Sequence, residues 1–286
     1  MIYRRQSVLD TFPIKVFIFV IIASVGILVS KAFAASETPG PIIVQGGDFS
    51  FAGPEQVAAG LVAFHFANVG QESHHAQLVR LPDDLQAAEF VEALKRDERE
   101  ALNLVRQVGG VAAVAPGGEA EVGLTLEAGT YAFICVIPSP SDRVRHVEKG
   151  MVLPFVVTEP AAVSAPPATL GTFFLRDFAF EMPAVMPAGH ATYKVVNDGP
   201  GQPHEIAIVR LVDGATVEDV RRSIMTPSGP PPFRAVGGFQ ATEAGSDGYV
   251  TLDLEPGEYA AICRVTDRGS GLSHVHLGMV SGFRVE

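Results

Sequence analysis

The sequence predicts an all-β protein made of two domains. A length of 286 residues corresponds to about two domains as a soft prior. The 29 glycines and 21 prolines indicate many turns. Several short segments alternate apolar with polar or small residues, which is typical of strands. With 47% hydrophobic residues, the chain has enough apolar material for two cores.

The N-terminal residues 1–35 have the pattern of an export signal. The basic start "MIYRRQ" precedes an apolar run from Val16 to Ser30, and "AFAAS" supplies the small residues of a cleavage site. An uncleaved membrane anchor is the alternative, although this run is shorter than the roughly 20 residues of a bilayer span. We therefore expect an exported protein, periplasmic or extracellular.

The charge of the chain is acidic, with a formal value of −11. Residues 1–34 hold four basic residues and one acidic residue, so the remainder has 17 basic and 31 acidic residues and a charge of −14. This balance argues against nucleic acid or an anionic membrane as a partner. It is compatible with a basic protein partner.

Three blocks of the sequence occur twice. "FANVGQESHHAQLVRL" matches "VVNDGPGQPHEIAIVRL", "VGLTLEAGTYAFICVI" matches "VTLDLEPGEYAAICRV", and "RHVEKGMVLPFVV" matches "SHVHLGMVSGFRV". Their offsets are 130, 128 and 128 residues. The near-constant offset predicts a duplicated domain at 41–159 and 171–286. An Ala- and Pro-rich linker, 160–170, joins the two copies.

Each copy is predicted to place its cysteine on a core-facing strand. In the preceding strand, apolar residues alternate with polar or small ones. The apolar residues are Val122, Leu124 and Leu126 in the first copy, and Val250, Leu252 and Leu254 in the second. After a turn, the next strand carries its cysteine on the same face as a tyrosine. These same-face residues are Tyr131, Phe133 and Cys135 in the first copy, and Tyr259, Ala261 and Cys263 in the second.

Each copy also has a helical insertion between its first-histidine strand and its cysteine strand. In the first copy one apolar stripe is expected to end at Gly109–Gly110, and the second copy has the shorter "ATVEDVRRSI". We expect these helices to flank a β-sandwich. The stripes consist of Phe90, Leu94, Ala101 and Val105, and of Val217, Val220 and Ile224.

Four residue types with metal-binding side chains recur at matched positions. Both copies contain Cys-x10-His-x4-Met, whereas the residues between the cysteine and the histidine are almost unrelated. The residues at the ends of this loop therefore matter more than those between them. Copper accepts a thiolate, two imidazoles and a weak axial thioether. The predicted metal ligands are His74, Cys135, His146 and Met151, and His204, Cys263, His274 and Met279.

Each copy resembles a cupredoxin, the Greek-key β-sandwich of type 1 copper proteins. The resemblance includes a first histidine that follows an Asn/Gly turn, from Asn68 to His74 and from Asn197 to His204. It covers nearly the whole chain after the signal, twice, and implies one copper ion in each domain. The eleven-position step from cysteine to histidine is longer than in short members of the family and is similar to that of two-domain copper enzymes.

Other histidines compete with the predicted ligands. Adjacent strand residues point to opposite faces, which favours His74 over His75. His276 competes with His274, but its counterpart in the first copy is Glu148. His65 is expected on the solvent face, and His190 has no counterpart.

The two cysteines have alternative interpretations. A disulfide is the default in an exported protein, but it would require equivalent interior strands of two domains to meet face to face. A buried thiol explains one cysteine but not the histidine and methionine that follow both. Taken alone, either methionine is better explained as a core residue than as a ligand.

Electron transfer to an unidentified redox partner protein is the function that the resemblance implies. A site closed by an axial methionine has no open position for a substrate. Related copper enzymes need a second copper centre, usually connected to the first through a histidine next to the ligand cysteine. Here no histidine is next to either cysteine; the neighbours are Ile134, Val136, Ile262 and Arg264. We therefore expect no enzyme. Copper storage or delivery, and a metal-free binding module, are the alternatives.

Overall fold

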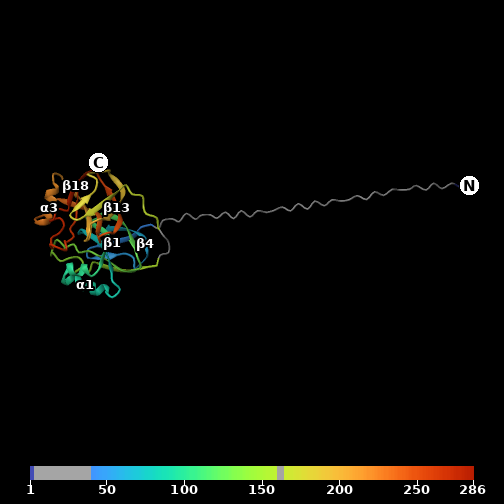
Figure 1. The fold of residues 1–286 in the computed structure, drawn as a ribbon, viewed down its shortest axis with the longest axis horizontal. Coiled ribbons are helices and arrows are strands. Elements are labelled where there is room, and N and C mark those ends of the chain that lie inside the picture. The colour runs from blue at the N-terminus through green and yellow to red at the C-terminus, as the bar shows by residue number, and fades with distance from the viewer. Residues whose placement is uncertain (3–39, 160–163) are drawn as a thin grey trace. The chain divides into compact units, whose positions relative to one another are not determined.

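The computed structural model of the protein describes residues 1–2, 40–159 and 164–286 (Figure 1). Nearly all of the predicted signal, and residues 160–163 of the predicted linker, lie outside these ranges. Thr38–Glu286 form one compact unit. Within the described ranges, no helix is long and apolar enough to cross a membrane.

The described residues 40–159, here called the first half, contain nine strands and two short helices. Several strands end at turns that contain glycine or proline, such as 115–118 after β6 (Arg106–Val114). The elements are β1 (Ile42–Gly47), β2 (Ser50–Ala52), β3 (Gln56–Ala58), β4 (Gly60–Asn68), β5 (His74–Leu81), α1 (Ala87–Arg96), α2 (Glu98–Asn103), β6 (Arg106–Val114), β7 (Glu119–Leu126), β8 (Gly129–Ile134) and β9 (Val152–Thr158).

The described residues 164–286, here called the second half, repeat this order with one helix in place of two. Strand pairings repeat as well: β1 pairs with β2 and β4 as β10 pairs with β11 and β13. The elements are β10 (Gly171–Arg176), β11 (Ala179–Glu181), β12 (Val185–Met186), β13 (Gly189–Asn197), β14 (His204–Leu211), α3 (Val217–Met225), β15 (Phe233–Thr242), β16 (Asp247–Leu254), β17 (Gly257–Ile262) and β18 (Val280–Val285).

Two sheets run through both halves without interruption. One has eight strands in the order β11-β10-β13-β16-β7-β4-β1-β2, and the other has ten in the order β12-β18-β17-β14-β15-β6-β5-β8-β9-β3. The halves join through antiparallel pairs, β7 with β16 and β6 with β15. Backbone hydrogen bonds therefore hold the halves side by side.

The main core lies between these two sheets. It is formed by the inward residues of strands from both halves, including the predicted Val122, Leu124 and Leu126 and their counterparts on β16. The chain crosses repeatedly from one sheet to the other, as in a Greek key: β4 and β7 pair in one, while β5 pairs with β6 and β8 in the other. The prediction of an all-β sandwich is confirmed.

Strand β8 differs from the prediction because both of its faces are buried. Ala132 and Ile134 point away from the main core but are fully covered, and they pack with α1 and α2 in a second cluster. Ala260 and Ile262 of β17 lie in the equivalent cluster with α3. The helices thus flank the ten-stranded sheet, and in Figure 1 α1 and α3 lie at the edge of the strands.

The first helical insertion ends earlier than predicted. It breaks into α1 and α2 at Asp97, whose side chain caps α2 by accepting from the Glu100 backbone N–H. Gly109 and Gly110 do not stop a helix; they lie inside β6 with φ of 113° and 121°. The predicted stripe of four apolar residues is nevertheless buried.

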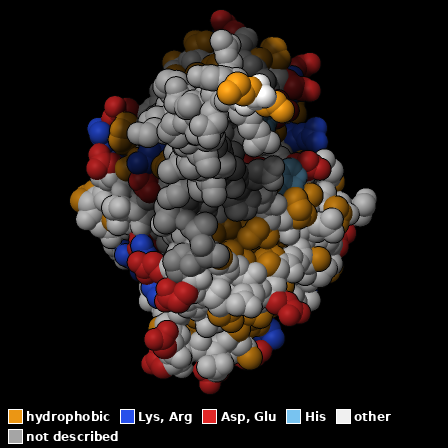
Figure 2. All heavy atoms as spheres, turned by 90° about the vertical axis from the view of Figure 1, so that its right-hand side faces the viewer, with side chains coloured by type: hydrophobic (Ala, Val, Ile, Leu, Met, Phe, Trp, Pro, Cys, Tyr) orange, Lys and Arg blue, Asp and Glu red, His pale blue; other side chains and the backbone are white. Residues whose placement is uncertain are grey.

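The face drawn in Figure 2 carries acidic and basic side chains scattered around its margin, with acidic ones in the larger number. This distribution agrees with the negative charge of the chain. The charges on this face do not gather into a single basic patch of the kind that nucleic acid requires.

Candidate metal centres

The structure brings the predicted histidines and cysteines together in two groups. His74, Cys135 and His146 form one, and His204, Cys263 and His274 form the other. Within each group the ligand atoms all lie within 4.8 Å of one another, and all six residues are fully buried. Each half therefore has one cluster of two imidazoles and a thiol.

The strand ends and one loop place the side chains of the first group. His74 is the first residue of β5, and Cys135 directly follows β8. His146 and Met151 lie in the loop that leads to β9, which folds back so that the Val147 N–H donates to the Cys135 carbonyl at 2.7 Å. The second half repeats this with Cys263 after β17.

The nitrogen atoms that converge are Nδ1 of each histidine. Nδ1 of His74 and of His146 are 3.0 Å apart, and Sγ of Cys135 is 3.4 Å from Nδ1 of His146. In the second group, Nδ1 of His204 and of His274 are also 3.0 Å apart. Sγ of Cys263 lies 3.9 Å from Nδ1 of His204 and 3.2 Å from Nδ1 of His274.

The backbone of each predicted methionine is hydrogen-bonded to the backbone of the cysteine in the same half. The Cys135 N–H donates to the Met151 carbonyl at 3.3 Å, and the Cys263 N–H donates to the Met279 carbonyl at 3.2 Å. Both methionine side chains are fully buried. Each methionine N–H also donates to the carbonyl of the histidine five residues before it.

Carboxylates contact the opposite nitrogen, Nε2, of three of these histidines. Asp48 lies 3.0 Å from Nε2 of His74, and Asp177 lies 2.9 Å from Nε2 of His204. These aspartates occupy the turns β1–β2 and β10–β11. Neither aspartate is among the residues predicted from the sequence, although D-F-x-F recurs at 48–51 and 177–180.

The second histidine of each group has a different environment in the two halves. Nε2 of His146 lies 2.8 Å from Oε2 of Glu72. The corresponding residue of the second half is Gln202, whose Oε1 instead accepts from the Arg268 N–H. Nε2 of His274 is buried and has no hydrogen-bond partner among the described residues.

Each of these carboxylates can accept the Nε2 proton of its histidine, which leaves the Nδ1 lone pair of that ring free for a bound cation. A neutral histidine that donates from Nε2 presents a lone pair at Nδ1. In the first group both Nδ1 atoms are then acceptors at 3.0 Å, and the single Cys135 proton can satisfy only one of them. A soft divalent or monovalent metal ion among two lone pairs and a thiolate would satisfy all three.

Burial perturbs the ionisation of the groups in both clusters. It raises the pKa of Cys135 to about 12 and that of Cys263 well above its usual value. It lowers the pKa of His274 to about 4, helped by the nearby His204. It also lowers the pKa of His146, although the hydrogen bond that this ring donates to Glu72 acts in the opposite direction. Burial thus favours the neutral form of the His146, His204 and His274 rings and the protonated form of both thiols when no metal is bound.

A phenylalanine covers one histidine of each cluster. The Phe49 ring meets the His146 ring edge-on at 5.2 Å, and the Phe178 ring meets His274 at 5.3 Å. Both phenylalanines have left-handed backbones, with φ of 66° and 61°, which a bulky residue adopts at a cost. The two turns hold a ring and a carboxylate against each cluster.

The competing histidines lie apart from the two clusters. His75 faces away from His74, and its Nε2 accepts from the Val136 N–H at 2.9 Å. His276 is exposed and contacts Ser273, while His65 pairs with Glu119 at 3.2 Å. His190 is exposed. Both cysteines are free, so the disulfide alternative is wrong.

No family model and no curated protein matches this chain. Among solved structures, auracyanin A of Chloroflexus aurantiacus, a "blue" copper protein, is 23% identical over 42% of this chain and 99% of its own, with a TM-score of 0.29. The copper nitrite reductase of Nitrosomonas europaea is 15% identical over 85% and 93%, with a TM-score of 0.26. A multicopper oxidase is 16% identical over 86% and 88%, with a TM-score of 0.26.

The chain has a cupredoxin-like β-sandwich fold. The two-sheet strand order described above establishes this sandwich. The expectation that the chain is no enzyme is contradicted, because the similar structures that span both halves are a multicopper oxidase and a nitrite reductase. The lack of a histidine beside either cysteine does not exclude an enzyme with this cupredoxin-like fold.

Proposed function

We propose that the protein binds one copper ion in each half and transfers electrons through these two centres. The observation that carries the proposal is the convergence of two Nδ1 atoms and one Sγ in each half, with carboxylates fixing three of the four rings. Soft thiolate and imidazole ligands together select copper or zinc. The buried methionine beside each cysteine favours copper.

The proposed ligands have distinct roles. His74, Cys135 and His146 would hold the ion in the first half, with Met151 as a weak fourth ligand. His204, Cys263, His274 and Met279 would do so in the second. A copper ion held by such residues exchanges one electron between its two oxidation states. The protein contributes a rigid and buried set of donors, which limits rearrangement between those states.

Three further elements of the proposal come from the sequence. The pattern of residues 1–35 supports export, the repeated blocks support an origin by tandem duplication, and the acidic surface supports a redox partner with a basic docking face. The matched strand pairings of the two halves also support duplication.

Absorption spectroscopy with added Cu(II) tests the proposal. The protein is titrated with Cu(II) alongside Cys135→Ala, Cys263→Ala and the double variant, and copper content is measured after dialysis. We expect two copper ions and an intense visible thiolate-to-copper band that halves in each single variant and disappears in the double variant. Reduction by ascorbate should bleach the band, and reoxidation should restore it.

Other results would favour the alternatives. Tight copper binding without the visible band, or a band that does not cycle, would support storage or delivery. Failure of copper to raise the unfolding temperature would support a metal-free module, because a ligand of the native state must stabilise it.

A further inference from the structure

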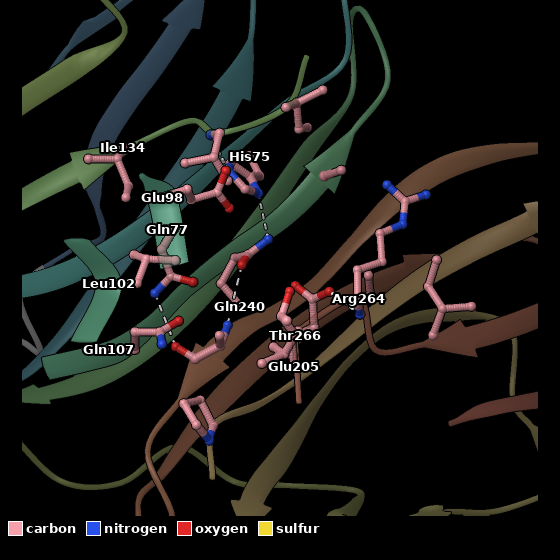
Figure 3. Close-up of a pocket in the computed structure, with 18 of the residues that line it drawn as sticks. His75, Gln77, Glu98, Leu102, Gln107, Ile134, Glu205, Gln240, Arg264 and Thr266 are labelled. Atoms are coloured by element: carbon pink, nitrogen blue, oxygen red, sulfur yellow. Dashed lines mark hydrogen bonds between the residues drawn. The ribbon is translucent and has the colours of Figure 1, made fainter. Parts of the chain in front are cut away.

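A cavity of about 450 Å³ lies where the two halves meet, apart from both clusters. Its wall is formed by β5 and β6 of the first half, β14 and β15 of the second, the helix α2, and the segments that follow the two cysteines. Figure 3 shows the side chains of His75, Gln107, Glu205 and Gln240 around it, contributed by strands of both halves. The volume is far larger than the roughly 30 Å³ of one water molecule.

Two of these residues occupy corresponding positions in the two halves. His75 and Glu205 each follow a first histidine, and each accepts from the backbone N–H of the residue after a cysteine. The Val136 N–H donates to Nε2 of His75 at 2.9 Å, and the Arg264 N–H donates to Oε1 of Glu205 at 2.7 Å. The halves therefore present different chemistry to the cavity: an imidazole from one and a carboxylate from the other.

Glu205 has unused hydrogen-bonding capacity directed at the cavity. Its residue is only 6% exposed, yet its second carboxylate oxygen has no hydrogen-bond or ion-pair partner within residues 40–159 and 164–286. This oxygen is reached from the cavity and is free to accept from a ligand that carries a donor group.

Gln107 supplies a second buried polar group without a partner. It is 7% exposed and lines the same cavity, and its side-chain amide makes no hydrogen bond with the described residues. In contrast, Gln77 donates to three backbone carbonyls and Gln240 contacts His75. Among these polar side chains of the cavity wall, Glu205 and Gln107 therefore have hydrogen-bonding atoms that no described residue contacts.

The remaining wall is largely apolar, and its arginines have other contacts. Arg268 pairs with Glu243, Arg99 donates to the Arg268 carbonyl, and Arg264 lies over the Phe233 ring. None of the three forms an ion pair with Glu205, although the charge of Arg264 acts on this carboxylate at longer range. The apolar lining includes Leu102, Ile134, Ile137, Ile208 and Ile262.

We propose that this cavity binds a small organic amine with an apolar body, whose ammonium group is held by Glu205 and Gln107. An ammonium group has three donors and no acceptor, which suits a free carboxylate oxygen and an amide oxygen. The apolar body fills a site with few polar groups, as in most small-molecule pockets. The site is separate from the copper proposal and does not depend on it.

Isothermal titration calorimetry with the full chain tests this site. The probe is 2-phenylethylamine, compared with the neutral 2-phenylethanol and the anionic 3-phenylpropanoate. We expect the amine to bind at least tenfold more tightly than either. Glu205→Gln, which keeps an oxygen for the Arg264 N–H, should lower amine affinity at least tenfold, and Glu218→Gln on exposed α3 should leave it unchanged.

A second variant tests the location independently of charge. Ala113 lines the cavity, so Ala113→Leu reduces its volume and should weaken binding of the amine. Circular dichroism confirms that each variant is folded. No heat with any probe, equal affinity for the alcohol and the amine, or unaltered amine binding in Ala113→Leu would overturn the proposal.

Discussion

Glu72 and His146 are joined by a contact of 2.8 Å between the carboxylate and Nε2 of the ring. The first cluster thus has carboxylates on both of its histidines, whereas the second has only Asp177, because Gln202 stands in place of Glu72. The two proposed copper centres have the same inner donors but differ by one nearby negative charge. A negative charge stabilises the more positive oxidation state of a metal. The first centre should have the lower reduction potential.

Glu72→Gln should raise the reduction potential of the first centre. A unit charge at about 8 Å with an effective dielectric constant near 20 to 40 contributes roughly 1–2 kcal/mol, or roughly 40–90 mV for one electron. The measurement is a spectroscopic redox titration in a Cys263→Ala background, which leaves one centre. The reverse change, Gln202→Glu in a Cys135→Ala background, should lower the potential of the second centre.

Glu127→Gln is the matched control for this pair. Glu127 is an exposed acid of the same half that pairs with Arg80, so its loss should alter the potential little. Equal shifts in Glu72→Gln and Glu127→Gln would mean that net charge, rather than the contact with His146, sets the potential.

Copper uptake should release about one proton per ion at pH 7. Burial raises the pKa of Cys135 to about 12, so this thiol is protonated before the metal binds and must become a thiolate. Burial lowers the pKa of His274 to about 4 and lowers that of His146, so these two rings have no proton to release. Apparent affinity should therefore rise about tenfold per pH unit between pH 6.5 and 8. Calorimetry in buffers of different ionisation enthalpy measures the protons released, and a value near zero would contradict thiolate ligation.

The sequence predicted the converging side chains better than their surroundings. Cys135 and His146 could be predicted as metal ligands because the same spacing recurs in the second copy, in a loop of different composition. The recurring D-F-x-F could have marked Asp48, but its contact with His74 spans 26 residues and depends on the parallel pairing of β1 with β4, which the sequence does not show. Gly109 and Gly110 were misassigned to a helix end because glycine marks both helix ends and irregular strands. Only the pairing of β6 with β5 shows that these two glycines belong to a strand and not to a helix end.

Gly110→Ala should destabilise the protein by about 3 kcal/mol or more. A Cβ at this position would collide with the carbonyl oxygen of Ala76 on β5, and the backbone φ of 121° disfavours any side chain. Gly117→Ala is the control: its φ is 71°, but a Cβ there would meet nothing within 4 Å, so its cost should be about 1 kcal/mol. Urea unfolding followed by circular dichroism compares them. Equal losses would show that backbone strain, and not the collision with β5, determines the cost.

His75 should make the stability of the metal-free protein depend on pH. Burial lowers its pKa to about 3, with smaller effects from the neighbouring His146, Arg264 and His74. A group with a depressed folded pKa contributes stability above its unfolded pKa of about 6.5, and this contribution is lost as pH falls toward the folded value. Protonation would also remove the lone pair that accepts from the Val136 N–H.

Between pH 6.5 and pH 4 this one residue should remove about 3 kcal/mol of the free energy of unfolding. His75→Gln retains an oxygen for the Val136 N–H, as Glu205 does for Arg264 in the second half, but it cannot be protonated. The variant should therefore lose less stability than the wild type over this range. Urea unfolding at pH 7, 5.5 and 4.5 gives both slopes, and their difference isolates His75 because the other titrating groups are shared. Parallel slopes would show that the His75 ring is not held neutral between the two halves.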